Sequence, residues 1–262
     1  MMKTARWFVL SGAVFLLAAC QTEGIRFPSA EVMPGESSLS VIATVHRPQG
    51  AGPFPALVLL HTCGSVNEAM TNRANFVKDL GYVALVVDTF GFRGVDGCPI
   101  SFMIDSAMTR DAYGALDYLA SLPYVKKHRI GVMGFSAGGH AIDRFVSREY
   151  QSPGGLNFRA AVNMYGVCQL MGDAVFEDEK IIIRTVMILG DQEESWRLFP
   201  CRDLIGKSPM ITVHIFKGVY HAFDSRRNAS MDSVGNIIQY SASATAKAEE
   251  ITTAFFAKHL GK

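Results

Sequence analysis

Residues 131–140 read GVMGFSAGGH, and the interpretation of the chain starts from this stretch. Ile130–Met133 is an apolar run that predicts a buried β-strand, and it leads into Ser136, which lies between Gly134 and Gly138. A serine between two glycines, where a strand ends and a helix begins, is typical of a nucleophile elbow, a sharp turn that exposes the hydroxyl. We therefore predict that Ser136 is a nucleophile at the carboxyl edge of a sheet.

Strands and helices are expected to alternate along most of the chain. Short continuous apolar runs favour strands buried on both faces, and apolar residues three or four apart favour helices that cover them. The expected strands are Ile25–Phe27, Val41–Arg47, Ala56–Leu60, Tyr82–Val87, Ile130–Met133, Ala160–Met164, Val186–Leu189 and Ile211–Phe216. The alternation predicts an α/β protein with a doubly wound, mostly parallel sheet and helices on both faces.

Length and charge indicate a globular protein with a substantial core and argue against nucleic-acid binding. At 262 residues with 49% hydrophobic residues, the chain is long enough to bury one substantial core. Its formal net charge is +1, without a long basic or acidic block. Because nucleic-acid binding needs clustered Lys and Arg, we expect no nucleic-acid partner.

The N-terminus has the composition of an export signal. Lys3 and Arg6 precede the apolar stretch Trp7–Ala19, which is shorter than the ~20 residues that a membrane-spanning helix needs. The small residues before Cys20 resemble the lipobox of bacterial lipoproteins, in which the cysteine is lipid-modified and the preceding segment is removed. An uncleaved anchor is the alternative.

We accordingly expect a lipoprotein signal peptide over residues 1–19 and a single mature domain over residues 20–262. Acyl chains on Cys20 would anchor the exported protein at the periplasmic face of a bacterial membrane. Gln21 resembles an outer-membrane sorting signal, which favours the outer membrane over the inner one.

A serine hydroxyl needs a base to take its proton, so a histidine is required near Ser136. Around a nucleophile elbow the residues follow in the order serine, acid, histidine, each after a strand. His221 fits this order, because it comes soon after the expected strand Ile211–Phe216. His214 lies inside that strand and His259 lies in the last expected helix, so neither is favoured.

The acid is expected after the strand Val186–Leu189, where Gly190 is followed closely by the carboxylates Asp191, Glu193 and Glu194. A charge at a helix N-terminus or in a solvated loop is the alternative role for each of them. The residues alone leave the choice among the three open.

Two backbone amides are expected to hold the oxyanion that forms when an acyl group is attacked. One is the N–H of Ala137, directly after the nucleophile, and the other is the N–H of Cys63, in the loop after Ala56–Leu60. His61, in the same loop, is expected to bond the backbone of that loop rather than a substrate.

Taken together, these segments resemble the dienelactone hydrolase family of α/β-hydrolases. The resemblance rests on FPSAE (27–31), PFPALVLLHTCGSVN (53–67), VVDTFGFRG (86–94), GFSAGG (134–139) and KGVYHAFD (217–224), and it runs over nearly the whole mature chain. It implies the α/β-hydrolase fold and hydrolysis of a small-molecule carboxylic ester or lactone. The family's spacing puts the acid three residues past the glycine, which selects Glu193 and leaves Asp191 as the alternative.

Two positions depart from the name-giving members of that family. Those members use a cysteine nucleophile where this chain has Ser136, and they keep a glutamate in the oxyanion loop where this chain has Thr62. Both changes favour general ester hydrolysis over dienelactone hydrolysis itself. Arg93 lies near the position at which those members carry an arginine for a substrate carboxylate, and Arg226 is a second candidate. A structural or solvated arginine is the alternative for both.

Export to an oxidising compartment favours disulfides among the remaining cysteines. We predict Cys63–Cys98 and Cys168–Cys201, because each pair lies in loops that follow neighbouring strands at the carboxyl edge of the sheet. Free buried thiols are the alternative. None of these cysteines has the close spacing of a zinc site, so we expect no metal, and we expect no cofactor.

The sequence as a whole predicts an exported, lipid-anchored serine hydrolase that cleaves esters or lactones through an acyl-enzyme. A peptidase or an acyltransferase would use the same residues, since each proceeds through an acyl-enzyme. A catalytically inactive binding lipoprotein is a further alternative, because the acid loop departs from the usual pattern.

Overall fold

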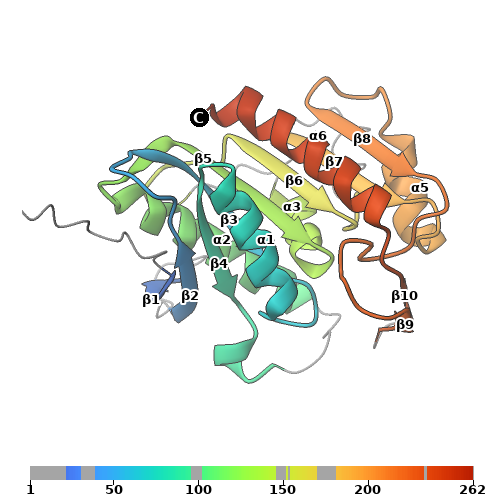
Figure 1. The fold of residues 1–262 in the computed structure, drawn as a ribbon, viewed down its shortest axis with the longest axis horizontal. Coiled ribbons are helices and arrows are strands. Elements are labelled where there is room, and N and C mark those ends of the chain that lie inside the picture. The colour runs from blue at the N-terminus through green and yellow to red at the C-terminus, as the bar shows by residue number, and fades with distance from the viewer. Residues whose placement is uncertain are drawn as a thin grey trace, which may run out of the picture.

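The computed structural model describes residues 22–30, 39–95, 102–145, 152, 154–169, 181–232 and 235–261. Its centre is an eight-stranded sheet in the order β1-β2-β4-β3-β5-β6-β7-β8 (Figure 1). The strands are β1 (Thr22–Pro28), β2 (Ser40–His46), β3 (Phe54–Leu60), β4 (Val83–Asp88), β5 (Val125–Phe135), β6 (Ala160–Met164), β7 (Arg184–Gly190) and β8 (Ile211–Phe216). β2 pairs antiparallel with β1 and β4, and the pairs from β4 to β8 are parallel.

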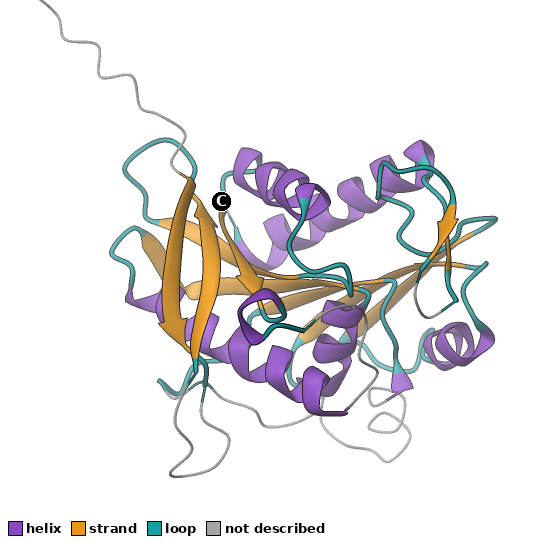
Figure 2. Cartoon of the chain, turned by 90° about the horizontal axis from the view of Figure 1, so that it is seen from below, coloured by secondary structure: helices purple, strands orange, loops and turns teal. Residues whose placement is uncertain are grey.

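Helices cover both faces of this sheet, as Figure 2 shows. α1 and α6 lie on one face, and α2 and α3 lie on the other (Figures 1 and 2). The helices are α1 (Glu68–Asp79), the short 3-10 helix η1 (Gly91–Arg93), α2 (Phe102–Ser121), α3 (Ala137–Phe145), α5 (Ser195–Asp203) and α6 (Ala242–Leu260). A small hairpin, β9 (Ser230–Met231) with β10 (Ile237–Ile238), follows β8.

Local sequence explains where the two long helices on the first face begin. The side chain of Asn67 caps α1 by accepting a hydrogen bond from the Met70 amide at 3.3 Å. The Ser241 hydroxyl caps α6 in the same way, accepting from the Ala244 amide at 3.3 Å. Both caps satisfy an amide that has no partner inside the helix.

The predicted fold class is confirmed, and the expected apolar runs lie within the strands of the sheet to within one residue at each end. β5 is longer than expected, because it begins at Val125 rather than Ile130. The sequence reading missed α5 and the β9–β10 hairpin. α5 contains Pro200 and has no clear apolar stripe, and each strand of the hairpin has two residues, too few for an alternating pattern.

Candidate active site

Ser136 lies at the sharp turn between β5 and α3, as the glycine pattern predicted. Its φ of 51° is in the left-handed region, which a residue with a side chain seldom adopts. A Cβ atom on Gly134 would collide with the backbone of Gly138, and one on Gly138 would collide with the carbonyl of Leu60. The two glycines therefore allow the strand and the helix to approach closely enough to form the turn.

The base expected from the sequence lies against this serine. His221 is 3% exposed, and its Nε2 is 2.9 Å from Ser136 Oγ. The histidine follows β8 and forms an isolated parallel bridge with Ile238 of the hairpin. The edge of the Tyr165 ring packs against the imidazole, with 5.0 Å between ring centroids. Packing and backbone pairing thus hold the ring with Nε2 toward the serine.

Of the two candidate acids, Glu193 is the one that meets His221. Its Oε2 and Oε1 atoms lie 2.9 and 3.1 Å from His221 Nδ1, and its side chain has no exposed surface. Asp191 instead accepts hydrogen bonds from the Gly218 amide at 2.6 Å and from the Gln192 side chain at 2.9 Å. Asp191 therefore shapes the loop between β7 and α5, and the alternative assignment of the acid to Asp191 is not supported.

The loop after β3 packs on the elbow and carries the second expected oxyanion donor. The Gly138 amide donates to the His61 carbonyl at 3.0 Å, which ties this loop to the start of α3. His61 Nδ1 lies 2.6 Å from the Thr62 carbonyl, and its Nε2 accepts from the Thr89 amide at 3.2 Å. His61 thus bonds the backbone around it, as expected. Burial lowers its pKa, although the hydrogen bond to Thr62 opposes the effect.

A cavity of about 360 Å³ opens beside the serine. Its lining includes two of the three candidate catalytic side chains, Ser136 and His221. Cys63 from the oxyanion loop and Asp232 and Ile238 from the hairpin segment line it as well. Ala137, the other expected oxyanion donor, is the first residue of α3 and is 6% exposed. The cavity is within the size range of small-molecule sites.

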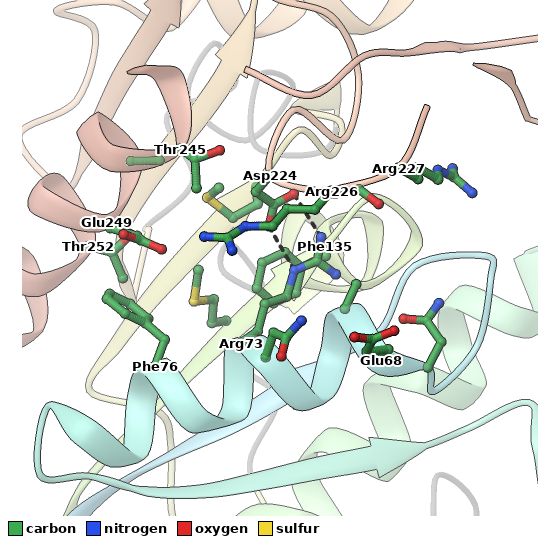
Figure 3. Close-up of a pocket in the computed structure, with 17 residues that line it drawn as sticks. Glu68, Arg73, Phe76, Phe135, Asp224, Arg226, Arg227, Thr245, Glu249 and Thr252 are labelled. Carbon is green, nitrogen blue, oxygen red and sulfur yellow. Dashed lines mark hydrogen bonds and ion pairs between the residues drawn. The ribbon is translucent and has the colours of Figure 1, made fainter. Parts of the chain in front are cut away.

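A second cavity, of about 670 Å³, lies between α1 and α6 and shares residues with the first (Figure 3). Asn67, Ala69, Arg73, Ser225 and Arg227 line both cavities. The shared residues make the two cavities neighbours.

Arg73 and Asp224 form an ion pair where the two cavities meet, and the sequence reading did not identify it (Figure 3). Nε and Nη2 of Arg73 donate to the Asp224 carboxylate, each at 2.8 Å. The Tyr165 hydroxyl accepts from Arg73 Nη2 and donates to Asp224 Oδ1, both at 2.7 Å. Burial alone would raise the pKa of Asp224, but the charge and hydrogen bonds of Arg73 hold it below its ordinary value.

The two arginines proposed for a substrate carboxylate lie in different places. Arg93 forms a two-pronged ion pair with buried Asp111, at 2.7 and 2.9 Å, and is not among the described residues that line either cavity. Ser29 also donates to Asp111, at 2.6 Å. The structural alternative is therefore favoured for Arg93, because its guanidinium holds the protein's own carboxylate. Arg226 is exposed, lines the larger cavity and extends across it toward α6 (Figure 3).

One of the two predicted disulfides joins described residues. Cys168, after β6, and Cys201, on α5, form a disulfide with a Cα–Cα distance of 5.0 Å. Cys63 is also a disulfide cysteine, but its predicted partner Cys98 lies outside the described residues. Cys20 lies outside them as well, so the Cys63–Cys98 pairing and the lipid anchor stay predictions.

The described residues contain neither a membrane-spanning helix nor a metal site. No helix there is long and apolar enough to cross a membrane. No group of three or more His, Cys, Asp or Glu side chains there is arranged to hold a metal ion.

Comparison with known proteins places the chain in a family. The model of the dienelactone hydrolase family matches residues 41–260. The chain belongs to the dienelactone hydrolase family. No functionally curated protein matches this family member in sequence.

Solved structures share its fold. The dienelactone hydrolase-like promiscuous phosphotriesterase P91 from metagenomic libraries is 19% identical, with a TM-score of 0.68, and the match covers 92% of this chain and 99% of that one. A dienelactone hydrolase from Anabaena variabilis is 17% identical, with a TM-score of 0.63 and coverages of 92% and 99%. A Pyrobaculum calidifontis esterase is 18% identical, with a TM-score of 0.64 and coverages of 91% and 85%. The fold is therefore one that ester and lactone hydrolases use.

Proposed function

We propose that this protein is a serine hydrolase that cleaves carboxylic esters or lactones through an acyl-enzyme. The observation that carries the proposal is the line of short contacts from Ser136 Oγ through His221 to the buried Glu193, beside a cavity of small-molecule size. Membership of the dienelactone hydrolase family supports the same reaction type.

The proposed reaction begins with proton transfer from serine to histidine. With a proton on Nδ1 facing Glu193, His221 has a free lone pair on Nε2 for the Ser136 proton. Ser136 Oγ then attacks the substrate carbonyl carbon, and Glu193 stabilises the imidazolium that forms. His221 returns the proton to the departing alkoxide, which leaves an acyl group on Ser136. A water molecule, activated by His221 in the same way, releases the acid and regenerates the serine.

The oxyanion of each tetrahedral intermediate would be held by the amides of Ala137 and Cys63. Both belong to segments that pack on the elbow, so their positions are set before substrate binds, which is the condition for effective electrostatic stabilisation. We propose Arg226 as the residue that attracts an anionic group elsewhere on the substrate, because its guanidinium extends over the neighbouring cavity.

We further propose that the enzyme is exported and held at the periplasmic face of the outer membrane by acyl chains on Cys20. The basic start, the short apolar stretch and the small residues before that cysteine support this location. Intact-mass analysis of membrane-extracted protein should find acyl additions at Cys20. A soluble product that begins at another residue would contradict the anchor.

A panel of esters and lactones with varied acyl length and charge tests the activity, with Ser136→Ala as the matched control. A fluorophosphonate probe should label the wild type at Ser136 and leave Ser136→Ala unlabelled. Added alcohol and amine acceptors separate hydrolysis from acyl transfer, because a transferase would yield new esters or amides. If the wild type neither takes the probe nor cleaves any substrate, a binding role replaces the proposal.

A further inference from the structure

A buried arginine lies directly behind Glu193. Arg197, on α5, is 2% exposed, and its Nη1 donates to Glu193 Oε2 at 2.8 Å. The same oxygen is 2.9 Å from His221 Nδ1. One carboxylate oxygen thus lies between the imidazole and the guanidinium, and the side chain of Glu193 has no exposed surface from which water could replace either partner.

The line of contacts continues from Arg197 into the wall of the cavity. Nη1 of Arg197 also donates to Asn236 Oδ1 at 2.9 Å. Asn236 in turn donates to Asp232 through its backbone amide at 2.9 Å and through its side chain at 2.7 Å. Asp232 lines the cavity beside Ser136, as does Ile238, whose backbone bridges to His221. Arg197 therefore joins Glu193 to the hairpin that forms one side of the cavity.

We infer that Arg197 is a positioning residue for the proposed triad, holding Glu193 as a carboxylate aimed at His221 and keeping the β9–β10 hairpin against the same site. The inference rests on the proposed function, because it assigns Arg197 a role in the reaction of Ser136. Arg197 itself contacts neither the nucleophile nor the cavity in the described part of the chain.

The physical reason is the burial of Glu193. A carboxylate removed from water favours its neutral form, and an opposite charge within hydrogen-bond distance restores the charged form. A protonated Glu193 would stabilise the imidazolium poorly. Removing the positive charge of Arg197 favours binding of a proton by the Glu193–His221 pair as a whole, so the active form, with a charged Glu193 and a neutral His221, is reached only at higher pH. The acidic limb of the pH profile should therefore move upward.

The other titratable groups around the site do not change the direction in which the acidic limb is expected to move. His140, on α3, stays neutral above about pH 3, because burial, then Arg197 and His221, lower its pKa to about 3. Burial raises the pKa of Tyr165, although Arg73 opposes the effect, so this ring is also neutral. Asp224 faces Arg73 and Tyr165, and Asp232 faces Asn236.

The test measures the rate of fluorophosphonate labelling of the full-length protein from about pH 5 to about pH 9. Arg197→Met removes the charge and keeps most of the side-chain volume. We expect it to slow labelling on the order of 10- to 100-fold at neutral pH, with recovery at high pH, because the charged form of Glu193 is less favoured without its cationic partner. Arg202→Met, an exposed arginine on the same helix, is the matched control and should keep the wild-type profile.

Two further variants separate charge from position. Asn236→Ala releases the hairpin but keeps the Arg197–Glu193 pair, so labelling should slow less than in Arg197→Met, with the acidic limb unmoved. Arg197→Lys keeps the charge on a shorter side chain, so labelling should slow while the limb stays near its wild-type position. If Arg197→Met does not fold, Arg197→Lys decides the matter, and a wild-type rate in that variant would overturn the inference.

A readout that needs no turnover separates this inference from the proposed function. The low-field proton resonance of the His221 Nδ1–H bonded to Glu193 should be present in the wild type and shifted or lost in Arg197→Met. A folded Arg197→Met variant with an unmoved acidic limb and an unchanged resonance would overturn the role of Arg197. A wild type that is not labelled but shows the Arg197-dependent resonance would instead refute the hydrolase and leave the positioning role standing.

Discussion

Two arginine–carboxylate pairs lie close to His221 and reach it differently. In the pair Arg197–Glu193, the carboxylate bonds the imidazole directly, and both side chains are within 2% of full burial. In the pair Arg73–Asp224, side chains that are 10% and 11% exposed reach the imidazole only through the ring of Tyr165. The first pair can alter the charge of the base, whereas the second can alter only the position of the loop that carries it.

This difference separates two kinds of variant. Changes at Glu193 and Arg197 should alter the rate and its pH dependence, in addition to the stability lost when a buried charge is left unpaired. Changes at Arg73 and Asp224 should alter stability more than rate, because their contacts hold α1 to the segment after β8 without touching Ser136 or the imidazole nitrogens.

The largest effect is expected from removing the acid. Glu193→Gln should lower kcat by about 10³- to 10⁴-fold, since the amide cannot stabilise the imidazolium. Asp191→Asn is the matched control two residues away, and it should change kcat only slightly because Asp191 bonds its own loop. Steady-state kinetics on an activated ester would show the contrast. The reverse pattern, with Asp191→Asn inactive, would mean that the acid assignment is wrong.

The disulfide braces the Arg197 side of the site. Cys168 and Cys201 are both fully buried and 33 residues apart, and Cys201 lies on the same helix as Arg197. Replacing both by alanine should lower the free energy of unfolding by about 3–4 kcal/mol on the chain-entropy account. Denaturant titration of protein expressed in an oxidising compartment, so that the disulfide forms, measures this loss. A midpoint equal to that of the wild type would show that the bridge does not stabilise the fold.

Removing Arg73 should weaken the fold while leaving the chemistry largely in place. Arg73→Met leaves the Asp224 carboxylate without its ion pair, which costs about 3 kcal/mol, at the lower end for breaking a buried pair. The double variant Arg73→Met/Asp224→Leu should recover much of that loss, because no unpaired charge remains. Thermal denaturation combined with probe labelling compares the two. If folded Arg73→Met lost as much activity as Glu193→Gln, the two arginine–carboxylate pairs would not differ in their effect on the reaction.

The smallest effect is the pH dependence of stability contributed by Asp224. Arg73 and its hydrogen bonds hold the pKa of Asp224 below its ordinary value despite burial, so the pair stabilises the fold fully above that ordinary value, about 3.9 in an unfolded chain. The free energy of unfolding should therefore fall as the pH drops below about 4 toward the lowered pKa. Urea titrations across this range, with Arg73→Met/Asp224→Leu for comparison, would reveal it. If the free energy of unfolding changed equally with pH in both proteins, the pH dependence would come from other carboxylates.

Much of the fold and of the central site could be predicted, because both follow from local patterns. A continuous apolar run such as Ala56–Leu60 predicts a buried strand, and Gly134 and Gly138 predict the sharp turn at Ser136. Chain order selected His221, and the family's spacing favoured Glu193 while leaving Asp191 as the alternative acid. For Arg93 the sequence left a substrate-binding and a structural role open, because its position in the loop after β4 does not reveal that Asp111, on α2, pairs with it.

The sequence by itself determined the alternation of strands and helices, the serine at the turn after β5 and the chain order of the residues that meet it. Only the tertiary structure decided which carboxylate faces His221, and that Arg197 and Arg73 are largely buried partners of acids rather than solvated surface charges. The physical reason is that a periodic pattern records which residues leave water. Which charges are buried depends on how segments far apart in the chain pack together: Arg73 meets Asp224, 151 residues away. Even Arg197 and Glu193, four residues apart, are buried only because other segments cover them.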